Sequence, residues 1–273
     1  MEKITPDIIT PELLEAVIKT AAAAAREILA VYTTEFGSSA KEDHSPLTAA
    51  DMASHQLICQ QLAGLTPGIP ILSEESADTP YSTRKTWQRY WLVDPLDGTR
   101  EFIKRNGEFT VNIALIDRHQ PILGVVQVPV TNICYFAAAG IGAFKREGNE
   151  TKKLQVHPTT AGHFKVAGSR SHGSEKQSQF IKRLGENSEL ISIGSSLKFC
   201  LVAEGRVDIY PRFGPTSEWD TAAAQCIVEQ AGGRVIDTAF APLRYNTRES
   251  LLNPEFLVIA DPGFDWRPYL QGL

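Results

Sequence analysis

The chain has 273 residues, 42% of them hydrophobic and 22% charged, a balance typical of an ordinary globular protein that excludes a disordered or fibrous one. Its net charge is −5 and it has no basic tract, which excludes a general attraction for nucleic acid. It has no signal peptide and no apolar run of about 20 residues. We therefore expect a cytoplasmic protein without a transmembrane segment, and peripheral association with the inner membrane stays open.

The first half of the chain predicts helices followed by short strands. Apolar residues at helical spacing predict a helix over 11–32. A segment resembling a capping box at 48–51 predicts the start of a second helix, which continues to about residue 62. The charged stretch 145–153 is expected to be a solvated loop. Runs rich in valine, isoleucine and aromatic residues predict strands at 69–72, 90–93, 109–116, 122–130 and 134–138.

The second half alternates strands with helices. Paired glycines at 232–233 end the last of these helices. The mixture predicts layered helices and sheets in one domain, with an N-terminal subdomain of about residues 1–145 and a C-terminal subdomain of about 154–273. Strands are expected at 164–167, 190–193, 207–210, 235–236 and 256–259, and helices at 175–184, 197–203 and 220–231. The four cysteines lie far apart in apolar segments and are expected to be reduced core thiols.

The sharpest chemical signal is the sequence D-P-L-D-G-T at 94–99, directly after an apolar strand. Its proline and glycine favour a tight turn that can aim Asp94, Asp97 and the carbonyl of Leu96 at one point, with Thr99 placed to orient a water. Two carboxylates forced together repel unless a cation neutralises them. Ligands that are all oxygen favour Mg²⁺, Mn²⁺ or Ca²⁺ over zinc. Taken singly, Asp-Pro and Asp-Gly are also ordinary turn dipeptides.

Two further acidic segments repeat this pattern. Glu74 and Glu75 follow an apolar strand, and Glu218 and Asp220 open an apolar helix. Each has a simpler explanation: Asp220 could only stabilise the helix dipole, and Glu75 could be a surface acid. We assign no catalytic role to Glu218. The D-x-D-G-T motif of haloacid dehalogenase phosphatases is one residue shorter than the motif here, which changes the direction of the second carboxylate and disfavours that class.

These residues carry a resemblance to a known family. The segments 94–99, 74–75 and 219–223 resemble the three signatures of the inositol monophosphatase superfamily, which comprises lithium-sensitive, Mg²⁺-dependent phosphatases. Segments at 45–51, 98–116, 192–205 and 210–216 are similar to the bacterial 3′(2′),5′-bisphosphate nucleotidases of that superfamily. The resemblance covers nearly the whole chain. It implies an α-β-α-β-α layered sandwich of the inositol monophosphatase and sugar phosphatase type, an α+β fold.

The resemblance also implies a site for two or three Mg²⁺ ions. Asp51 and Thr99 would orient and deprotonate the attacking water. The implied metal ligands are Glu74, Asp94, the carbonyl of Leu96, Asp97 and Asp220. The implied substrate contacts are Glu74, Leu96, Asp97, Gly98, Thr99, His172, Ser195, Lys198, Arg212 and Asp220.

The implied substrate is adenosine 3′,5′-bisphosphate (PAP), converted to AMP and phosphate, with 3′-phosphoadenylyl sulfate (PAPS) as a second substrate. Related nucleotidases hold the nucleotide through a Ser-Arg-Ser-His segment, a Gly-Ser-Ser-x-Lys segment and a later Arg, which correspond to 169–172, 194–198 and Arg212. Lys198 and Arg212 supply the local positive charge that an acidic protein needs for a bisphosphate. Ser195 lies at an expected helix start, where free N–H groups favour an anion.

Simpler explanations and other functions stay open for this part of the chain. Lys198 could lie on a solvated helix face, and Arg212 could end a surface strand. The alternative functions are an inositol monophosphatase or another small phosphomonoesterase, and a catalytically silent nucleotide-binding protein. An intact acidic set disfavours the silent protein, and the two cations disfavour a monophosphate substrate.

Overall fold

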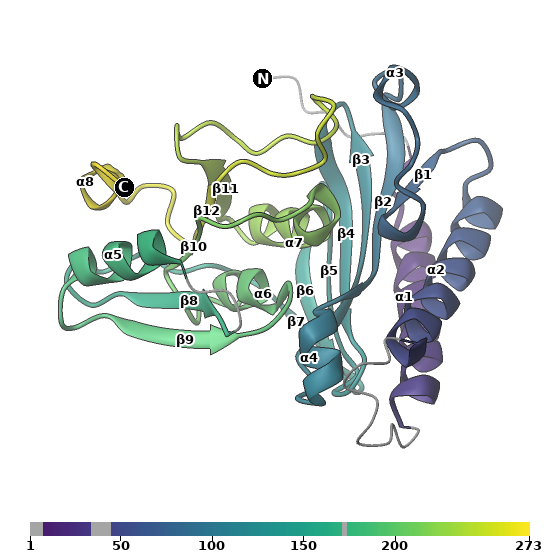
Figure 1. Ribbon diagram of the computed structural model, residues 1–273, viewed down its shortest axis with the longest axis horizontal. Coiled ribbons are helices and arrows are strands. Elements are labelled where there is room, and N and C mark those ends of the chain that lie inside the picture. The colour runs from purple at the N-terminus through teal and green to yellow at the C-terminus, as the bar shows by residue number, and fades with distance from the viewer. Residues whose placement is uncertain (1–7, 34–44, 171–173) are drawn as a thin grey trace.

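The computed structural model describes residues 8–33, 45–170 and 174–273, and it stacks helices and sheets in the expected α-β-α-β-α order (Figure 1). One outer layer contains α1 (Pro11–Tyr32) and α2 (Ser45–Leu65). The middle layer contains α6 (Leu197–Ala203) and α7 (Glu218–Gln230) between two sheets. The other outer layer contains α5 (Glu175–Leu184) and α8 (Arg267–Leu270). In the described parts of the chain, every helix is too short or too polar to span a bilayer.

The larger sheet has seven strands in chain order. β1 runs parallel to β2, and every later neighbour is antiparallel. The expected loop over 145–153 is wrong, because β6 and β7 pair there as a hairpin around Gly148. The exposed charged side chains of β7 suit a sheet edge, where they discourage further pairing. The strands are β1 (Ile71–Ser73), β2 (Arg89–Asp97), β3 (Thr110–Asp117), β4 (Gln120–Val128), β5 (Ile133–Ala138), β6 (Gly142–Glu147) and β7 (Glu150–Lys153).

Alternation along the central strands divides the larger sheet between two cores. Trp91 and Val93 belong to the core beneath α1 and α2, whereas Tyr90 and Leu92 belong to the core shared with α6 and α7. Both faces of the sheet are covered by helices, so both sets of alternating side chains are apolar. β2 therefore ends in a fixed orientation, and the acidic turn follows directly from it.

The smaller sheet has five strands in the order β11-β12-β10-β8-β9. β8, β9 and β10 are parallel to their neighbours within this group, and β12 is antiparallel to both β10 and β11. Phe164, Phe180 and Trp266 fill the core between this sheet and α5 and α8. The strands are β8 (Lys165–Ser169), β9 (Glu189–Ile193), β10 (Ile209–Arg212), β11 (Arg234–Asp237) and β12 (Phe256–Ile259).

The second helix begins earlier than the sequence predicted. α2 starts at Ser45, so Thr48 and Asp51 lie inside the helix and do not form a capping box. Pro46 is compatible with the earlier start, because the first helical turn has no hydrogen-bond partner for a backbone N–H at that position. The consequence is that Asp51 is held on a regular helix instead of at its fraying end.

Short elements and one close approach shape the site end of the fold. η2 (Glu74–Ser76), α3 (Tyr81–Arg84) and α4 (Thr99–Lys104) follow β1, η2 and β2 in chain order. A Cβ atom at Gly124 would lie 2.1 Å from the carbonyl oxygen of Ala223, so only glycine lets α7 lie this close to β4. The first turn of α7, which contains Asp220, is thereby held close to the larger sheet.

Candidate active site

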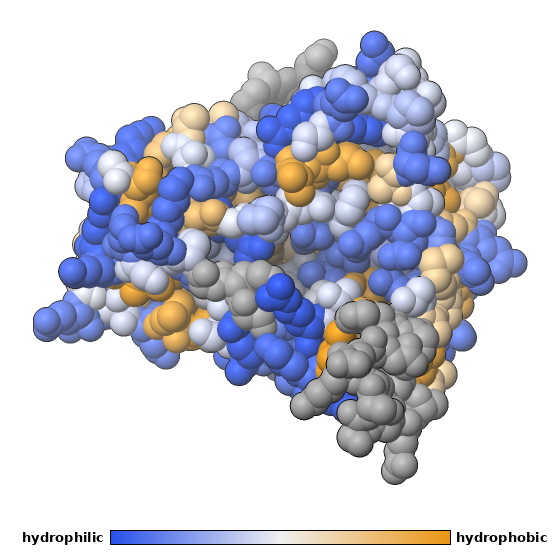
Figure 2. Space-filling model, viewed as in Figure 1, coloured by the Kyte–Doolittle hydropathy of each residue, from blue (hydrophilic) through white to orange (hydrophobic). Residues whose placement is uncertain are grey.

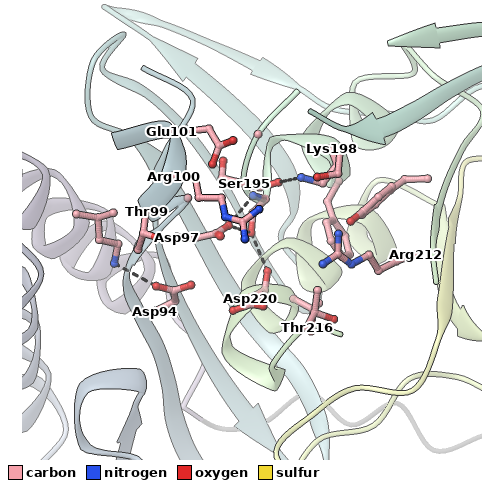
Figure 3. A pocket seen from close by; sticks show the side chains of 18 of the residues that line it. Asp94, Asp97, Thr99, Arg100, Glu101, Ser195, Lys198, Arg212, Thr216 and Asp220 are labelled. Atoms are coloured by element: carbon pink, nitrogen blue, oxygen red, sulfur yellow. Dashed lines mark hydrogen bonds between the residues drawn. The ribbon is translucent and has the colours of Figure 1, made fainter. Parts of the chain in front are cut away.

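A cavity of about 280 Å³ lies between the two sheets, where the end of β2 faces α6, β10 and the start of α7 (Figure 3). On the face of the molecule seen in Figure 2, hydrophilic side chains predominate and apolar ones form small separate groups. The fold brings residues that are far apart in the sequence to this cavity. Those among its lining that the sequence predicted are Glu74, Asp94, Leu96, Asp97, Gly98, Thr99, Ser195, Lys198, Arg212 and Asp220.

The acidic turn interrupts the pairing of β2 with β3. The register shifts between Asp94 and Asp97, and the Asp94 carboxylate accepts a hydrogen bond of 3.1 Å from the Leu96 N–H. Gly98 has φ 94°, and a Cβ there would lie 3.1 Å from the Glu108 carbonyl oxygen. The glycine therefore permits the turn for both reasons, and the turn places both aspartates in the lining of the cavity.

Burial and mutual repulsion raise the pKa values of the acidic side chains. Burial raises the pKa of Asp94 well above its usual range, and Asp97, Glu74 and Asp220 add to the effect. Burial and the charge of Asp97 raise the pKa of Asp220 to about 8. Burial also raises the pKa of Glu74, opposed by its hydrogen bond to Asp94. In this half of the cavity the carboxylates are therefore more stable when they bind a proton or a cation than when their negative charges are uncompensated.

This acidic set fits a hard divalent cation in its all-oxygen donors and in its charge. Among the described residues, no three Asp, Glu, His or Cys side chains already form a group that could hold an ion. The like charges of Asp97, Glu74 and Asp220 raise the pKa of Asp94, and a bound cation would offset this repulsion. An ion here would also need oxygen ligands other than side chains, for which the Leu96 carbonyl and water are available.

The two residues predicted to activate water occupy different places. Thr99 lines the cavity itself, at the start of α4. Asp51 is buried beside the cavity, and its Oδ1 has no hydrogen-bond partner among the described residues. Burial, followed by the charges of Glu75 and Glu74, raises the pKa of Asp51 to about 8. A raised pKa makes the Asp51 carboxylate a stronger base than an ordinary aspartate once it is ionised.

Two side chains that the sequence did not single out connect α2 to the acidic strand ends. Ser54 donates a hydrogen bond of 2.9 Å to the Pro95 carbonyl oxygen. His55 Nδ1 and Ser73 Oγ lie 2.9 Å apart in a hydrogen bond, next to Glu74. These contacts fix the helix that carries Asp51 relative to both acidic segments. They join distant parts of the chain, and no local pattern in the sequence signals them.

The helix start at Ser196 is used differently from the expectation. α6 begins at Leu197, as predicted, with Ser196 as its N-cap, but the Ser196 N–H donates to Asp97 Oδ2 at 2.7 Å. The anion held at this point is therefore the protein's own carboxylate. Ser195 lines the cavity with φ 45°, a backbone conformation that costs energy for a residue with a side chain. Its buried Oγ has no hydrogen-bond partner among the described residues.

The cationic half of the cavity comes from α6 and β10. Lys198 is 6% exposed, which excludes the solvated helix face. Its Nζ donates to the Ser195 carbonyl oxygen at 2.6 Å and lies 5.4 Å from the centre of the Tyr210 ring. Burial lowers the pKa of Lys198 to about 8. Arg212 donates to the carbonyl oxygens of Gly214 and Pro215 at 3.1 and 2.7 Å, which holds its guanidinium in the lining of the cavity.

The predicted Ser-Arg-Ser-His segment is described only in part. Ser169 lines the cavity, whereas His172 lies outside the described residues. Arg170 forms an ion pair with Glu108, with N–O distances of 2.6 and 2.9 Å, and the Gly194 N–H donates to the same carboxylate at 2.8 Å. The guanidinium of Arg170 is thus occupied in joining the two halves of the protein.

Other lining residues escaped the sequence analysis. Arg100 also lines the cavity. It directly follows the acidic signature at 94–99, and its place next to that signature could have identified it. Phe199, Tyr210 and Phe256 form an aromatic wall with ring centres 5.5 to 6.0 Å apart. Apolar residues of this kind are indistinguishable from core residues in a single sequence.

Comparison with known proteins places this geometry in a family. Residues 10–260 match the model of the inositol monophosphatase family. The chain is 52% identical over 249 residues to the 3′(2′),5′-bisphosphate nucleotidase CysQ of Escherichia coli, covering 90% of this chain and 99% of that protein. It is 38% identical over 261 residues to the CysQ of Haemophilus influenzae, covering 95% of this chain and 97% of that protein.

Solved structures agree with these matches. CysQ from Bacteroides thetaiotaomicron, a bacterial member of the inositol monophosphatase family, superposes with a TM-score of 0.85 at 43% identity. The alignment covers 93% of this chain and 99% of that structure. SuhB from Mycobacterium tuberculosis superposes with a TM-score of 0.71 at 26% identity, covering 91% and 90%. The layered fold, the acidic cavity and these matches together show that the chain belongs to the inositol monophosphatase family.

Proposed function

We propose that this chain is a 3′(2′),5′-bisphosphate nucleotidase that hydrolyses the 3′-phosphate of PAP and releases AMP and inorganic phosphate. The observation that carries the proposal is the pairing of an acidic half with a cationic half in one cavity. Lys198 and Arg212 lie opposite the carboxylates and offer a second place for negative charge. A bisphosphate has two such charges, and the relatives named as nucleotidases support the assignment. PAPS, which also has both anionic groups, is the second substrate.

The acidic half would hold Mg²⁺, on which enzymes of this family generally depend, through Glu74, Asp94, the Leu96 carbonyl, Asp97 and Asp220. We expect two or three ions. Bound Mg²⁺ supplies the positive charge that neutralises these carboxylates and the charge that develops on the transferred phosphate. Lithium inhibition, typical of the family, is expected with it.

The remaining chemistry is assigned to side chains of this chain. The Thr99 hydroxyl orients a water molecule, and Asp51 accepts its proton as the water oxygen attacks phosphorus. The bond between phosphorus and the 3′-oxygen of the ribose breaks in line, and the leaving oxygen takes a proton from solvent. Because water attacks directly, no phosphorylated enzyme forms. Lys198 and Arg212 hold the second phosphate and so place the first one at the acidic half.

The test compares phosphate release from PAP and from inositol 1-phosphate, each with Mg²⁺ and with EDTA. We expect a strong, Mg²⁺-dependent preference for PAP. In Lys198→Met, KM for PAP should rise at least tenfold while hydrolysis of inositol 1-phosphate, which has no second phosphate, changes little. Preference for inositol 1-phosphate would retain the metal site and overturn the substrate. Activity unaffected by EDTA would overturn the metal assignment.

A further inference from the structure

One carboxylate oxygen at the site, Asp97 Oδ2, has four hydrogen-bond donors around it. Asp97 Oδ2 accepts from the Ser196 N–H at 2.7 Å and contacts the Ser196 hydroxyl at 2.9 Å. The side chains of Asn112 and Thr110 lie 3.4 and 3.5 Å from the same oxygen. These donors come from β3 and from the start of α6. These donors hold Oδ2 next to β3 and α6. Oδ1 is therefore the carboxylate oxygen that points away from these donors.

Ser196 also contacts the other side of the site. Its Oγ lies 2.7 Å from the backbone carbonyl oxygen of Asp220 and accepts a hydrogen bond of 2.9 Å from Asn112. The side chain is 2% exposed, so water does not compete for these contacts. The one proton of this hydroxyl can be donated to the Asp97 carboxylate or to the Asp220 carbonyl oxygen, so the hydroxyl lies in contact with both the end of β2 and the first turn of α7. Figure 3 shows both aspartates at the cavity, contributed by these two elements.

The hydroxyl is not required by the helix that it precedes. Ser196 is the N-cap of α6, yet its side chain makes no capping hydrogen bond. A serine whose hydroxyl only stabilised a helix would accept a hydrogen bond from an N–H group of the first turn. Here the side chain contacts Asp97, Asp220 and Asn112 instead.

We propose that Ser196 is a positioning residue that orients Asp97 and the first turn of α7, so that Asp97 Oδ1 and the Asp220 carboxylate are presented together to Mg²⁺. This role rests on the metal site in the proposed function. The like charges of Asp97 and Asp220 repel each other, which works against such an arrangement. A fixed hydroxyl between the two segments limits how far they can separate. Residues that orient metal ligands in this way typically contribute 10- to 100-fold to metal affinity.

The test measures Mg²⁺ binding without substrate, by calorimetry and by the rise in Tm that Mg²⁺ causes. Ser196→Ala removes the hydroxyl and keeps the N–H that donates to Asp97. We expect Mg²⁺ to bind about 10- to 100-fold more weakly, with a smaller rise in Tm. At saturating Mg²⁺, kcat should return to within a few-fold of the native value and KM for PAP should not change.

The matched control is Thr20→Val, which removes another buried hydroxyl, one that donates to Gln61 between α1 and α2. This control should lower the Tm of the metal-free protein and leave Mg²⁺ affinity unchanged. Native Mg²⁺ affinity in Ser196→Ala would overturn the positioning role while the proposed function stands. If the native protein itself binds no Mg²⁺, both are overturned.

A second variant covers the case in which Ser196→Ala does not fold. Asn112→Ala removes the other side chain that contacts both Asp97 Oδ2 and Ser196 Oγ. We expect a smaller loss of Mg²⁺ affinity, of about three- to tenfold. Where Ser196→Ala does fold, combining the two substitutions should weaken Mg²⁺ binding by less than the product of the two single losses, because they act on one carboxylate oxygen. Unchanged Mg²⁺ affinity in Asn112→Ala would overturn the proposal in that case.

Discussion

Two carboxylates on the first turn of α7 lie in contrasting surroundings. Both oxygens of Glu218 accept from the Asn246 N–H at 2.9 Å, and Arg84 donates to the Asn246 side chain at 2.6 Å. Asp220, two positions later, faces the like charges of Asp97 and Glu74. Burial raises the pKa of both, to about 7 for Glu218 and about 8 for Asp220. In Glu218 hydrogen bonds and nearby arginines oppose that rise, whereas neighbouring acids reinforce it in Asp220.

We propose that this contrast separates a structural carboxylate, Glu218, from a functional one, Asp220. Glu218 and Arg84 hold the segment around Asn246 against α3 and the start of α7. Their charges are compensated within the protein. Asp220 is left beside other acids, an arrangement that costs stability and that a bound cation would relieve. We expect substitution of Asp220 to affect activity, and substitution of Arg84 to affect stability.

The largest effect is expected for Asp220→Asn. We expect kcat to fall by about 10³-fold or more, because the charge of a proposed metal ligand is lost. The metal-free protein should be as stable as before or more so, since the neutral amide relieves repulsion and its oxygen can still accept from the Ser217 N–H. Glu218→Gln is the matched variant and should keep kcat within about tenfold. Similar kcat losses in both variants would contradict the separation.

Arg84→Ala should give the next largest effect, on stability and not on chemistry. Arg84 is 2% exposed and also donates to the carbonyl oxygens of Arg248 and Glu249. Removing it leaves these buried acceptors and Glu218 uncompensated, at a cost of about 3 kcal/mol. Urea unfolding measures the change, and Arg267→Ala, at an exposed ion pair, should stay within about 0.5 kcal/mol. An unchanged urea midpoint for Arg84→Ala would contradict this account.

The smallest effect concerns the cationic half and its pH dependence. Burial lowers the pKa of Lys198 to about 8. As the pH rises through that value, the ammonium group loses its charge and the bisphosphate binds less well. We expect kcat/KM for PAP to fall about tenfold for each pH unit above the pKa. Lys198→Arg, which stays charged, should flatten this alkaline limb. If kcat/KM of Lys198→Arg fell with pH in the same way as in the native protein, a group other than Lys198 would be responsible for the fall.

The pH dependence of stability at Lys198 has the opposite direction. Its pKa in the folded protein lies below the ordinary value of 10.5, so the native state binds fewer protons than the unfolded chain between about pH 8 and 10.5. The contribution of Lys198 to stability therefore rises with pH across that window. Activity and stability measured over the same range should thus move in opposite directions.

The sequence predicted those parts of the site that lie within short segments. The acidic turn at 94–99 and the helix start at Asp220 are local patterns, and the fold brings both to one cavity. Their assigned roles remain predictions. The Ser196 contact with Asp97 and the Arg84 contact with Asn246 join residues far apart in the chain, and no local pattern signals them.

The errors in the fold have equally local causes. The 145–153 segment was too charged to resemble a strand, yet an edge strand tolerates charge on both faces because neither is covered.

The layered order of the fold was implied by the family resemblance and is confirmed. The alternation in strands such as 90–93 explains why that order is stable, since each strand provides apolar side chains to two cores.

The absence of a side chain at Gly124 determines how substitutions there would alter the width of the cavity. The backbone of β4 meets Ala223 at a distance that leaves no room for one more methyl group. Ala223 lies one helical turn beyond Asp220, so even Gly124→Ala must push that turn outward. The spacing between the two walls of the cavity therefore depends on a contact between residues that do not line the cavity. An engineer who wished to admit a larger leaving group could widen the cavity from there without altering any residue assigned to catalysis.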